Sequence, residues 1–295
     1  MCIDVIGSDA SRVLNNLCTA DIAKLPTGQC CEAFVTDIRG RVIAHVMCEK
    51  LEGGVRIVGQ HHDSESVAAH IDRYIIREDA VVTNRSGEVA VFAISNVQAL
   101  GDQDSNSGSA EAPFHLTLEM ESVPATVMPS LIVGPTSGIA CCASEVSSGL
   151  RDQLESLGFA LASSDQFELA RIRSFWPRSG REIQEKTLPQ ELDRDKVAIS
   201  FTKGCYLGQE TVARLDARGQ LQKKLCLVEI DGQLGESLDL TDADAVIGKV
   251  YSSAFDSSTG KTLALANMRR GYFEPGTQVQ YGNRSATVQS PEFDS

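Results

Sequence analysis

The sequence lacks most of the motifs that identify a function directly. No apolar run approaches the ~18–20 residues of a membrane span, and the first residues carry neither a basic n-region nor an Arg-rich presequence. The nine cysteines include no C-x-x-C spacing, so the usual zinc and redox motifs are absent. Neither G-x-G-x-x-G nor a Walker loop occurs, so nucleotide binding has no support. These absences predict a cytoplasmic protein without a membrane partner.

The composition sets further bounds on partners. The chain has 295 residues, with 27 Lys+Arg against 40 Asp+Glu and a formal net charge of -13. Such a length allows a sizeable core divided over two or three domains. An acidic surface repels phosphate backbones, so the charge argues against direct binding of nucleic acid.

Two groups of potential metal ligands have simpler explanations. Cys30-Cys31 and Cys141-Cys142 lie in apolar, strand-like surroundings. Neighbouring residues on a strand point to opposite faces, so we expect small core residues rather than ligands. Adjacent histidines in His61-His62-Asp63 also diverge, and we expect a polar start of a helix there, with Asp63 or Ser64 as the cap. The sequence therefore predicts no metal site.

Short β segments alternate with helices through most of the chain. Residues 30–35 and 42–48 flank a turn and predict a hairpin, and residues 80–83 with 89–94 predict a second one. Residues 131–133 predict a further strand.

The second half shows a helix start and then a change of pattern. Ser163-x-x-Gln166 fits a capping box and predicts a helix that Pro177 ends. Residues 101–112 form a polar stretch that predicts an exposed loop. After Gly219 the chain predicts a small β-barrel. Its expected strands are Lys224–Ile230, Ala245–Tyr251, Thr262–Met268, Val279–Tyr281 and Ala286–Gln289.

The run from Phe201 to Glu210 (FTKGCYLGQE) is the most informative part of the sequence. It follows neither helix nor strand periodicity, so burial alone explains it poorly. Its two glycines suit a tight loop around Cys205, and a short helix is predicted after Gly208. A helix N-terminus and nearby Lys203 both favour a thiolate at Cys205. The alternative, a structural loop with an inert cysteine, stays open at this point.

The same run carries a family resemblance. Residues 203–210, followed by Arg214 and Gly219, resemble the signature of YgfZ-type folate-binding proteins, which are relatives of the glycine-cleavage T-protein, an aminomethyltransferase. Residues 5–10 and 37–42 resemble the family's opening strand and its hairpin with a Gly-Arg turn. The resemblance implies an α+β, cloverleaf-like fold in which tetrahydrofolate or a derivative binds in a central channel.

The resemblance also implies a domain division. A folate-binding region would cover residues 1–220 and the C-terminal β-barrel residues 221–295. Within the first, one lobe would combine roughly residues 1–50 with 150–220, and the other would cover residues 51–149.

Three departures from the T-protein pattern bear on activity. Arg173 stands where the T-protein segment R-[IL]-E-A-G has the Glu that holds the pterin ring, and a guanidinium cannot accept hydrogen bonds. Ser66 falls on the family's catalytic Asp unless the alignment shifts it to Asp63, and the "T-N-D" segment has become Thr19-Ala20-Asp21. Aminomethyl transfer is therefore disfavoured, although whether the protein is an enzyme stays open.

The resemblance implies a folate-binding protein that supports iron–sulfur protein maturation and, through it, tRNA modification. Folate and iron–sulfur proteins or their assembly factors would be its partners. A tetrahydrofolate-dependent aminomethyl or other one-carbon transferase, using Asp21 or Asp63, is the first alternative. A non-catalytic scaffold with Cys205 simply packed is the second. The candidate site residues are Cys205 and Lys203 for catalysis, and Asp21, Arg173, Tyr206, Gln209 and Glu210 for the cofactor. With Arg173 on the glutamate tail, bound folate would lie close to Trp176.

Overall fold

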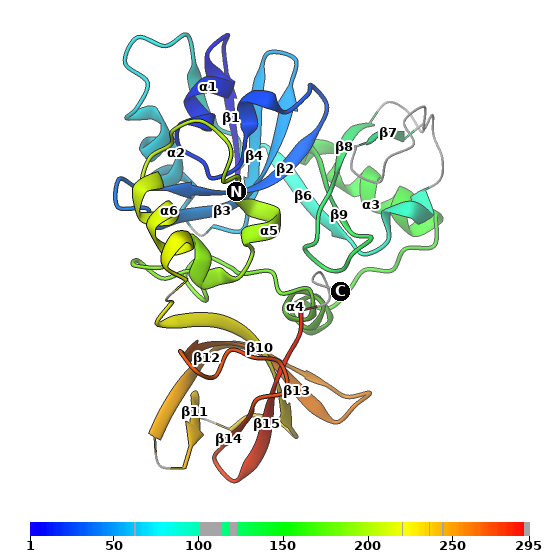
Figure 1. Ribbon diagram of the computed structural model, residues 1–295. Helices are drawn as coiled ribbons and strands as arrows, with labels where there is room; N and C mark the ends of the chain where they lie inside the picture. The colour runs from blue at the N-terminus through cyan, green and yellow to red at the C-terminus, as the bar shows by residue number, and fades with distance from the viewer. Residues whose placement is uncertain are drawn as a thin grey trace.

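The structure, a computed structural model, has an α+β fold of three lobes (Figure 1). Two lobes built on open sheets lie side by side, and a β-barrel lies below them (Figure 1). The residues that the structure describes are 1–61, 63–100, 114–118, 123–219, 221–235, 237–243 and 245–291.

The first lobe is a sheet with the order β2-β3-β4-β1-β5. Its strands are β1 (Cys2–Ile6), β2 (Cys30–Thr36), β3 (Val42–Leu51), β4 (Gly54–Gly59) and β5 (Val81–Asn84). Its Val- and Ile-rich strands bury one face against α1 (Ala10–Asn15) and α2 (Ser64–Asp72). The hairpin expected over residues 30–48 is confirmed by the β2–β3 register. Asp63 caps α2 as expected, accepting a hydrogen bond from Ser66 N at 2.9 Å.

Two expectations about strands are wrong. The second hairpin does not form, because β5 pairs with β1 whereas β6 (Val89–Ile94) pairs with β9 (Gly138–Ala143) of the next lobe. The turn between them exists, but Ser86 Oγ accepts a hydrogen bond from Cys2 N at 2.9 Å and holds the turn to β1. Residues 131–133 form a turn rather than a strand, since their backbone N–H groups bond the hydroxyls of Ser130 and Ser137. Long-range pairing and side-chain-capped turns outweighed local β propensity here.

The second lobe carries a sheet with the order β6-β9-β8-β7 and the helix α3 (Ser147–Ser156) on it. The remaining strands are β7 (Phe114–Leu118) and β8 (Val123–Pro129), with short 3-10 turns at Val97–Leu100 and Ser144–Val146. The polar loop expected over residues 101–112 lies outside the described residues. The first sheet extends to Asn84, past the lobe boundary expected near residue 50, because β4 and β5 both pair with β1.

Adjacent cysteines point to opposite faces, as expected. Cys31 packs in the core of the first lobe, whereas Cys30 packs in the core between the two lobes. Cys141 and Cys142 are divided in the same way between that interlobe core and the core of the second lobe.

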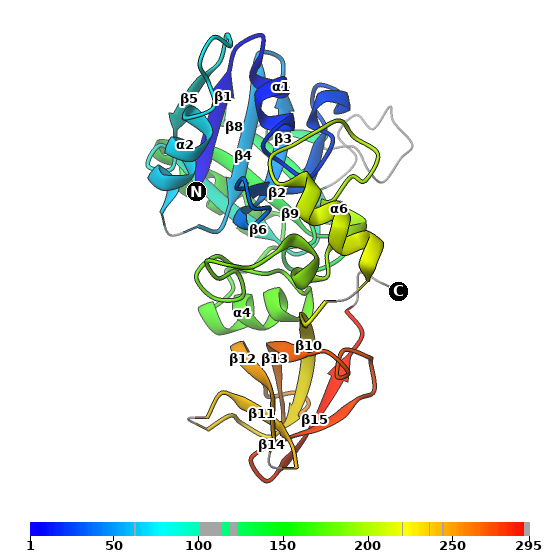
Figure 2. The same cartoon turned by 60° about the vertical axis from the view of Figure 1, so that its left-hand side comes forward.

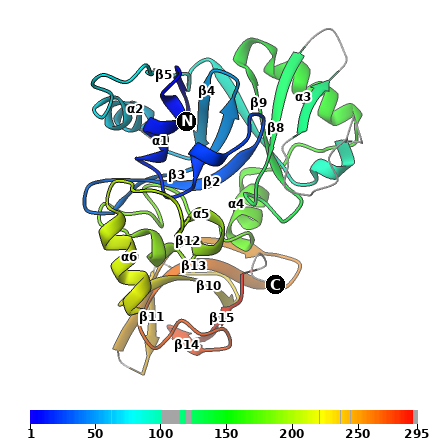
Figure 3. The same cartoon turned by 45° about the horizontal axis from the view of Figure 1, so that its top comes forward.

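The helix α4 (Ser164–Arg173) lies between the two upper lobes and the barrel (Figure 2). Its capping box is confirmed: Ser163 Oγ accepts from Gln166 N at 3.2 Å, and Gln166 Oε1 accepts from Ser163 N at 2.8 Å. The helix ends at Arg173, four residues before Pro177. The segment beyond it contains η4 (Pro189–Leu192), α5 (Asp195–Ala198) and α6 (Gln209–Arg218), and it returns to cover the first lobe (Figure 3).

The barrel expected after Gly219 is confirmed and closes in the order β10-β13-β12-β11-β14-β15. Its strands are β10 (Lys223–Asp231), β11 (Asp239–Asp242), β12 (Ala245–Asp256), β13 (Lys261–Arg269), β14 (Gln278–Tyr281) and β15 (Arg284–Gln289). The short, acidic β11 carries little sequence signal, since Asp is depleted in strands. No helix in the described part of the chain has the length and apolar character that a membrane span requires.

Candidate functional site

The signature loop, residues 201–208, is tied down by the ammonium group of Lys203. The Lys203 side chain is buried, and its Nζ donates to the backbone carbonyls of Asn15 at 2.6 Å, Cys18 at 2.8 Å and Ala20 at 2.5 Å. An ammonium has three donors, so all of them are satisfied. Nζ also lies 5.1 Å from the centroid of the Tyr206 ring. Burial lowers the pKa of Lys203. These contacts give Lys203 a structural task.

The glycine at position 208 is required by close packing of two backbones. Gly208 has φ 79°, and a Cβ there would approach the backbone of Gly40 to 2.3 Å. Only glycine adopts this conformation without strain and leaves room for the neighbouring chain. The turn at residues 37–40 therefore fixes the end of the signature loop, just before α6 begins.

Cys205 is exposed, at the tip of this loop. The ammonium of Lys203 points instead into the first lobe, so the expectation that Lys203 favours a thiolate at Cys205 loses its geometric basis. Tyr206 is buried, and burial raises its pKa to about 12. Gln209 and Glu210 form the first turn of α6, with Glu210 exposed.

Of the other two candidates, Asp21 lies near the Lys203 ammonium, next to Ala20, whereas Arg173 lies elsewhere. Asp21 pairs with Lys24 at 2.9 Å beside a short 3-10 turn, Ile22–Lys24. Arg173 Nη2 donates to Asp256 Oδ2 at 2.8 Å, which joins α4 to β12 of the barrel. Arg173 is therefore separate from the candidates near Lys203, and the assigned roles of all of them stay predictions.

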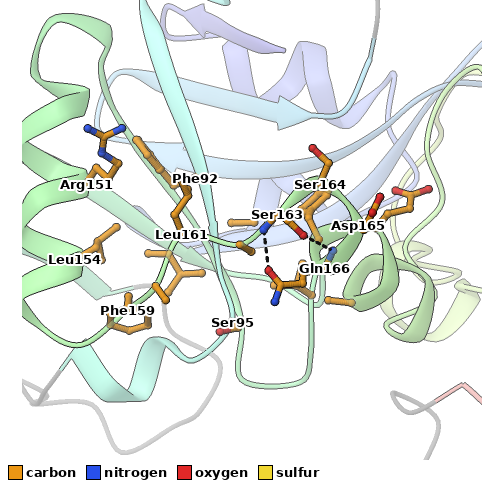
Figure 4. A pocket seen from close by; sticks show the side chains of 18 of the residues that line it. Phe92, Ser95, Arg151, Leu154, Phe159, Leu161, Ser163, Ser164, Asp165 and Gln166 are labelled. Atoms are coloured by element: carbon orange, nitrogen blue, oxygen red, sulfur yellow. Dashed lines mark hydrogen bonds between the residues drawn. The ribbon is translucent and has the colours of Figure 1, made fainter. Parts of the chain in front are cut away.

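A cleft of about 750 Å³ lies between the second lobe and the start of α4 (Figure 4). One part of its wall is apolar and comes from β6, α3 and the connection to α4: Phe92, Leu154, Phe159 and Leu161. The polar residues of the α4 capping box lie across from it (Figure 4). Arg151, Glu168 and Arg178 add charged groups to the lining. Small-molecule sites typically have ~300–1,000 Å³ and this mixture of apolar surface with few polar groups.

Two further hollows adjoin this cleft. One of about 110 Å³ shares Phe167 with it and is lined by Gln60 and Trp176. The other, about 630 Å³ and more open, shares Gln60 with the small hollow and Arg178 with the large cleft. We call the three together the ligand cleft. Its lining combines the first lobe, the second lobe and the segment around α4.

Two polar atoms in this lining lack a hydrogen-bond partner among the described residues: Gln60 Oε1 and Ser179 Oγ, both buried. A buried polar atom without a partner costs ~1–3 kcal/mol. Gln60 lines both smaller hollows, and rotation of its amide would turn Oε1 toward a ligand there.

Ion pairs hold the polar part of the wall in place. Glu168 accepts two hydrogen bonds from the buried guanidinium of Arg171, at 2.9 and 2.8 Å, and also pairs with Arg178 at 3.4 Å. Burial raises the pKa of Glu168, but these arginines outweigh it and the pKa is lowered.

The floor of the ligand cleft rests on a buried charged network. The Trp176 ring lies 4.3 Å from the ring of His45 and 5.1 Å from the guanidinium carbon of Arg194. Glu32 binds both partners, with Oε1 2.8 Å from His45 Nε2 and Oε2 2.5 Å from Arg194 Nη2. Burial raises the pKa of Glu32, but Arg194 and His45 outweigh it and lower the pKa to about 2. Sequence analysis missed this network, although Glu32 within the apolar strand β2 was a signal for a buried charge.

Among the described residues no group of three His, Cys, Asp or Glu side chains is placed to hold a metal ion.

Comparison with known proteins supports the class that this fold defines. Residues 1–99 match the GCVT N-terminal domain family. The crystal structure of aminomethyltransferase T of the glycine cleavage system from Bartonella henselae superposes with a TM-score of 0.82, covering 99% of this chain and 83% of that chain. Their sequence identity is 16%, so this match establishes the fold alone. The chain has the aminomethyltransferase T fold.

Sequence relatives point in two directions. The tRNA-modifying protein YgfZ of Serratia proteamaculans is 26% identical over 90% of this chain and 77% of that protein. A protein of Natronomonas pharaonis named "Probable aminomethyltransferase" is 23% identical over 99% of this chain and 84% of its own length. An uncharacterized protein of Haemophilus influenzae is 39% identical, over 34% of each chain. The resemblance to YgfZ-type proteins and to the T-protein is thus confirmed.

Proposed function

We propose that the protein is a YgfZ-like folate-binding protein whose ligand lies in the ligand cleft beside α4. The fold and the YgfZ relatives support a folate site. The observation that carries the proposal is the buried, unpartnered Oε1 of Gln60 in the wall of the cleft.

The residues of the ligand cleft fit the chemistry of a folate. The amino-pyrimidine edge of a pterin offers N–H donors, and Gln60 Oε1 is an acceptor without a partner among the described residues. Phe92, Phe159 and Phe167 supply apolar surface for the aromatic parts of the ligand. Arg178 supplies a guanidinium for the carboxylates of the glutamate tail. A bound tetrahydrofolate would supply a one-carbon carrier.

The structure argues against the aminomethyltransferase alternative. The Asp63 carboxylate, which a shifted alignment would make catalytic, caps α2. Arg173, at the position of the T-protein's pterin-binding Glu, pairs with Asp256 of the barrel. Asp21, the other carboxylate of that alternative, is paired with Lys24. We infer that the protein binds folate without transferring an aminomethyl group.

The finer proposal concerns the biological role. We propose that the protein supports iron–sulfur protein maturation and, through it, tRNA modification, with iron–sulfur proteins or their assembly factors as partners. The name of the Serratia relative supports a link to tRNA. The exposed position of Cys205, on a loop anchored by Lys203, makes this thiol accessible to a partner protein.

Titration with 5-formyl-tetrahydrofolate tests the binding site. Trp176 is the one tryptophan of the chain and lines the small hollow. We expect a saturable change in its fluorescence after correction for inner-filter absorption, and a much weaker response to p-aminobenzoylglutamate, which lacks the pterin. No saturable change, with calorimetry also negative at high ligand concentration, would contradict the proposal.

Complementation tests the role separately. In a bacterial strain lacking its own YgfZ-type protein, this chain should restore iron–sulfur enzyme activities and modified nucleosides in bulk tRNA. Cys205→Ser should fail to do so, whereas Cys226→Ser, in the buried wall of the barrel, serves as the matched control. Restoration by Cys205→Ser would remove the thiol from the proposal, and no restoration by any form would remove the role.

A further inference from the structure

Three thiols meet beneath the signature loop. The β2–β3 register places Cys31 directly opposite Cys48. Both pack on the core face of the first lobe, together with Cys18. The three side chains lie close enough for Cys18 and Cys31 to raise the pKa of Cys48. Sequence spacing gives no hint of this cluster, because strand pairing brings Cys31 to Cys48 and an isolated bridge to Val35 holds Cys18 beside β2.

The geometry of the opposed pair suits a disulfide bond. Directly opposite residues in an antiparallel pair have Cα atoms ~4.5–5.5 Å apart. Disulfides span Cα distances of ~4.4–6.8 Å. Cys31 and Cys48 can therefore be joined without moving the strands.

The two thiols differ in exposure and in charge environment. Cys48 is fully buried, whereas Cys31 is partly buried on β2, at the edge of the sheet. A hydrogen bond from Cys48, with a contribution from the Lys203 ammonium, lowers the pKa of Cys31 against the opposing effect of burial. Hydrogen bonds to Cys18 and Cys31 raise the pKa of Cys48, so it stays a thiol and donates. Burial raises the pKa of the adjacent Cys30 to about 12. Cys31 is thus the nucleophile of the cluster.

We propose that Cys31 and Cys48 form a redox-active dithiol that reacts with peroxides. The Cys31 sulfur attacks one peroxide oxygen: an S–O bond forms, the O–O bond breaks, and the leaving hydroxide takes a proton to become water. Cys31 is then a sulfenic acid, and the peroxide has been reduced. The Cys48 sulfur next attacks the Cys31 sulfur: an S–S bond forms, the S–O bond breaks, and the hydroxide leaves with the Cys48 proton as a second water.

The site is connected to the signature loop through Lys203. Its ammonium interacts electrostatically with all three thiols and binds the carbonyl of Cys18. Oxidation joins the Cys31 and Cys48 sulfurs by a covalent bond, so neither can ionise near that ammonium. The charge environment of Lys203, at the base of the loop that presents Cys205, therefore depends on the redox state of the pair.

Peptide mapping of the full-length protein after treatment with hydrogen peroxide tests the proposal. The native protein should yield a peptide pair joined through Cys31 and Cys48, two hydrogens lighter than the reduced pair and separated by dithiothreitol. In Cys48→Ser, dimedone should trap a sulfenic acid at Cys31. Cys31→Ser should give neither product, with its far-UV circular dichroism showing that it still folds.

Two controls make the result specific. Cys2 and Cys141 are also buried neighbours, and burial raises their pKa to about 11 and about 12, so they should stay reduced under the same treatment. Cys205→Ser should leave the Cys31–Cys48 product unchanged. Oxidation confined to Cys205, equal oxidation of Cys2 and Cys141, or a folded protein without the Cys31–Cys48 bond would each overturn the proposal.

Discussion

The signature loop and the ligand cleft differ in whether their buried polar groups have hydrogen-bond partners. In the loop, all three donors of Lys203 are bound by backbone carbonyls of the chain itself. In the cleft, Gln60 Oε1 and Ser179 Oγ are buried without partners among the described residues. The buried donors of the loop are thus bound within the chain, whereas the proposed ligand would supply partners in the cleft.

The loop and the cleft also differ in how conspicuous their key residues are in the sequence. The loop stands out because an ammonium, a ring and the glycine at position 208 hold one backbone path. The cleft residue Gln60 looks ordinary in the sequence, because its importance arises only when its neighbours leave it unpaired. A conspicuous sequence motif can therefore reflect what the backbone needs in order to fold, and not only contact with a ligand.

The largest expected effect is the loss of stability in Lys203→Met. This change removes the donor of the Asn15 and Cys18 carbonyls and one of the two donors of the Ala20 carbonyl, so we expect the free energy of unfolding to fall by about 3–5 kcal/mol. Guanidinium denaturation against Lys249→Met, an exposed control on β12, provides the measurement. A loss below about 1 kcal/mol would show that the loop does not depend on these bonds.

Asp195, on α5, tests what an unpartnered polar atom does outside the cleft. Its Oδ1 is buried without a partner among the described residues, and its pKa is raised to about 6, first by burial and then by Asp193 and Asp216. The folded protein thus binds this proton more tightly than the unfolded chain, whose Asp has a pKa of ~3.9. Ionisation of Asp195 therefore lowers the free energy of unfolding, and this loss develops as the pH rises from ~4 through 6.

Asp195→Asn should therefore be more stable than the wild type above pH 6, by about 1–2 kcal/mol. The gain should shrink as the pH falls below 6 and vanish near pH ~4. Thermal unfolding at pH 8, 6 and 4 measures it, with the exposed Asp239→Asn as control. An equal gain at every pH would rule out the ionisation as its cause.

The smallest expected effect distinguishes two arginines. Arg178 lines the ligand cleft, whereas Arg173 pairs with the barrel. Arg178→Ala should weaken binding of 5-formyl-tetrahydrofolate by about tenfold, the loss of one charged hydrogen bond, and Arg173→Ala by less than about twofold. Calorimetry with the ligand and with an analogue that lacks the glutamate tail distinguishes the two arginines. The analogue should bind Arg178→Ala and the wild type equally well. The reverse order would restore the role that the sequence assigned to Arg173.

Local sequence patterns predicted much of the fold. The capping box of α4 and the β2–β3 hairpin depend on neighbours close in the chain, and both are confirmed. The barrel is confirmed as well, because most of its strands carry their own pattern in the sequence although their partners are distant. The expected hairpin over residues 80–94 failed because β5 and β6 join different sheets. Nothing within that segment specifies its partners.

The candidate site was less predictable, because its contacts also join residues that are far apart in the sequence. Lys203 was predicted to take part in catalysis, but its contacts, which lie about 180–190 residues earlier in the chain, are structural. The pairing of Cys31 with Cys48 and the unpaired state of Gln60 exist only in the folded protein. Composition and spacing indicated candidate residues, and tertiary packing determined their contacts.

Calorimetric titration of Gln60→Ala with 5-formyl-tetrahydrofolate tests the central claim most directly. The exposed Gln280→Ala on β14 is the matched control. Removing the unpartnered acceptor should weaken binding by about tenfold, the value of one hydrogen bond to a buried group, while Gln280→Ala binds as the wild type does. The stability of Gln60→Ala should stay within about 1 kcal/mol of the wild type, because Gln60 Oε1 has no partner to lose. Unchanged affinity in Gln60→Ala would contradict the account, because the ligand would then bind without the atom that the cleft leaves unsatisfied.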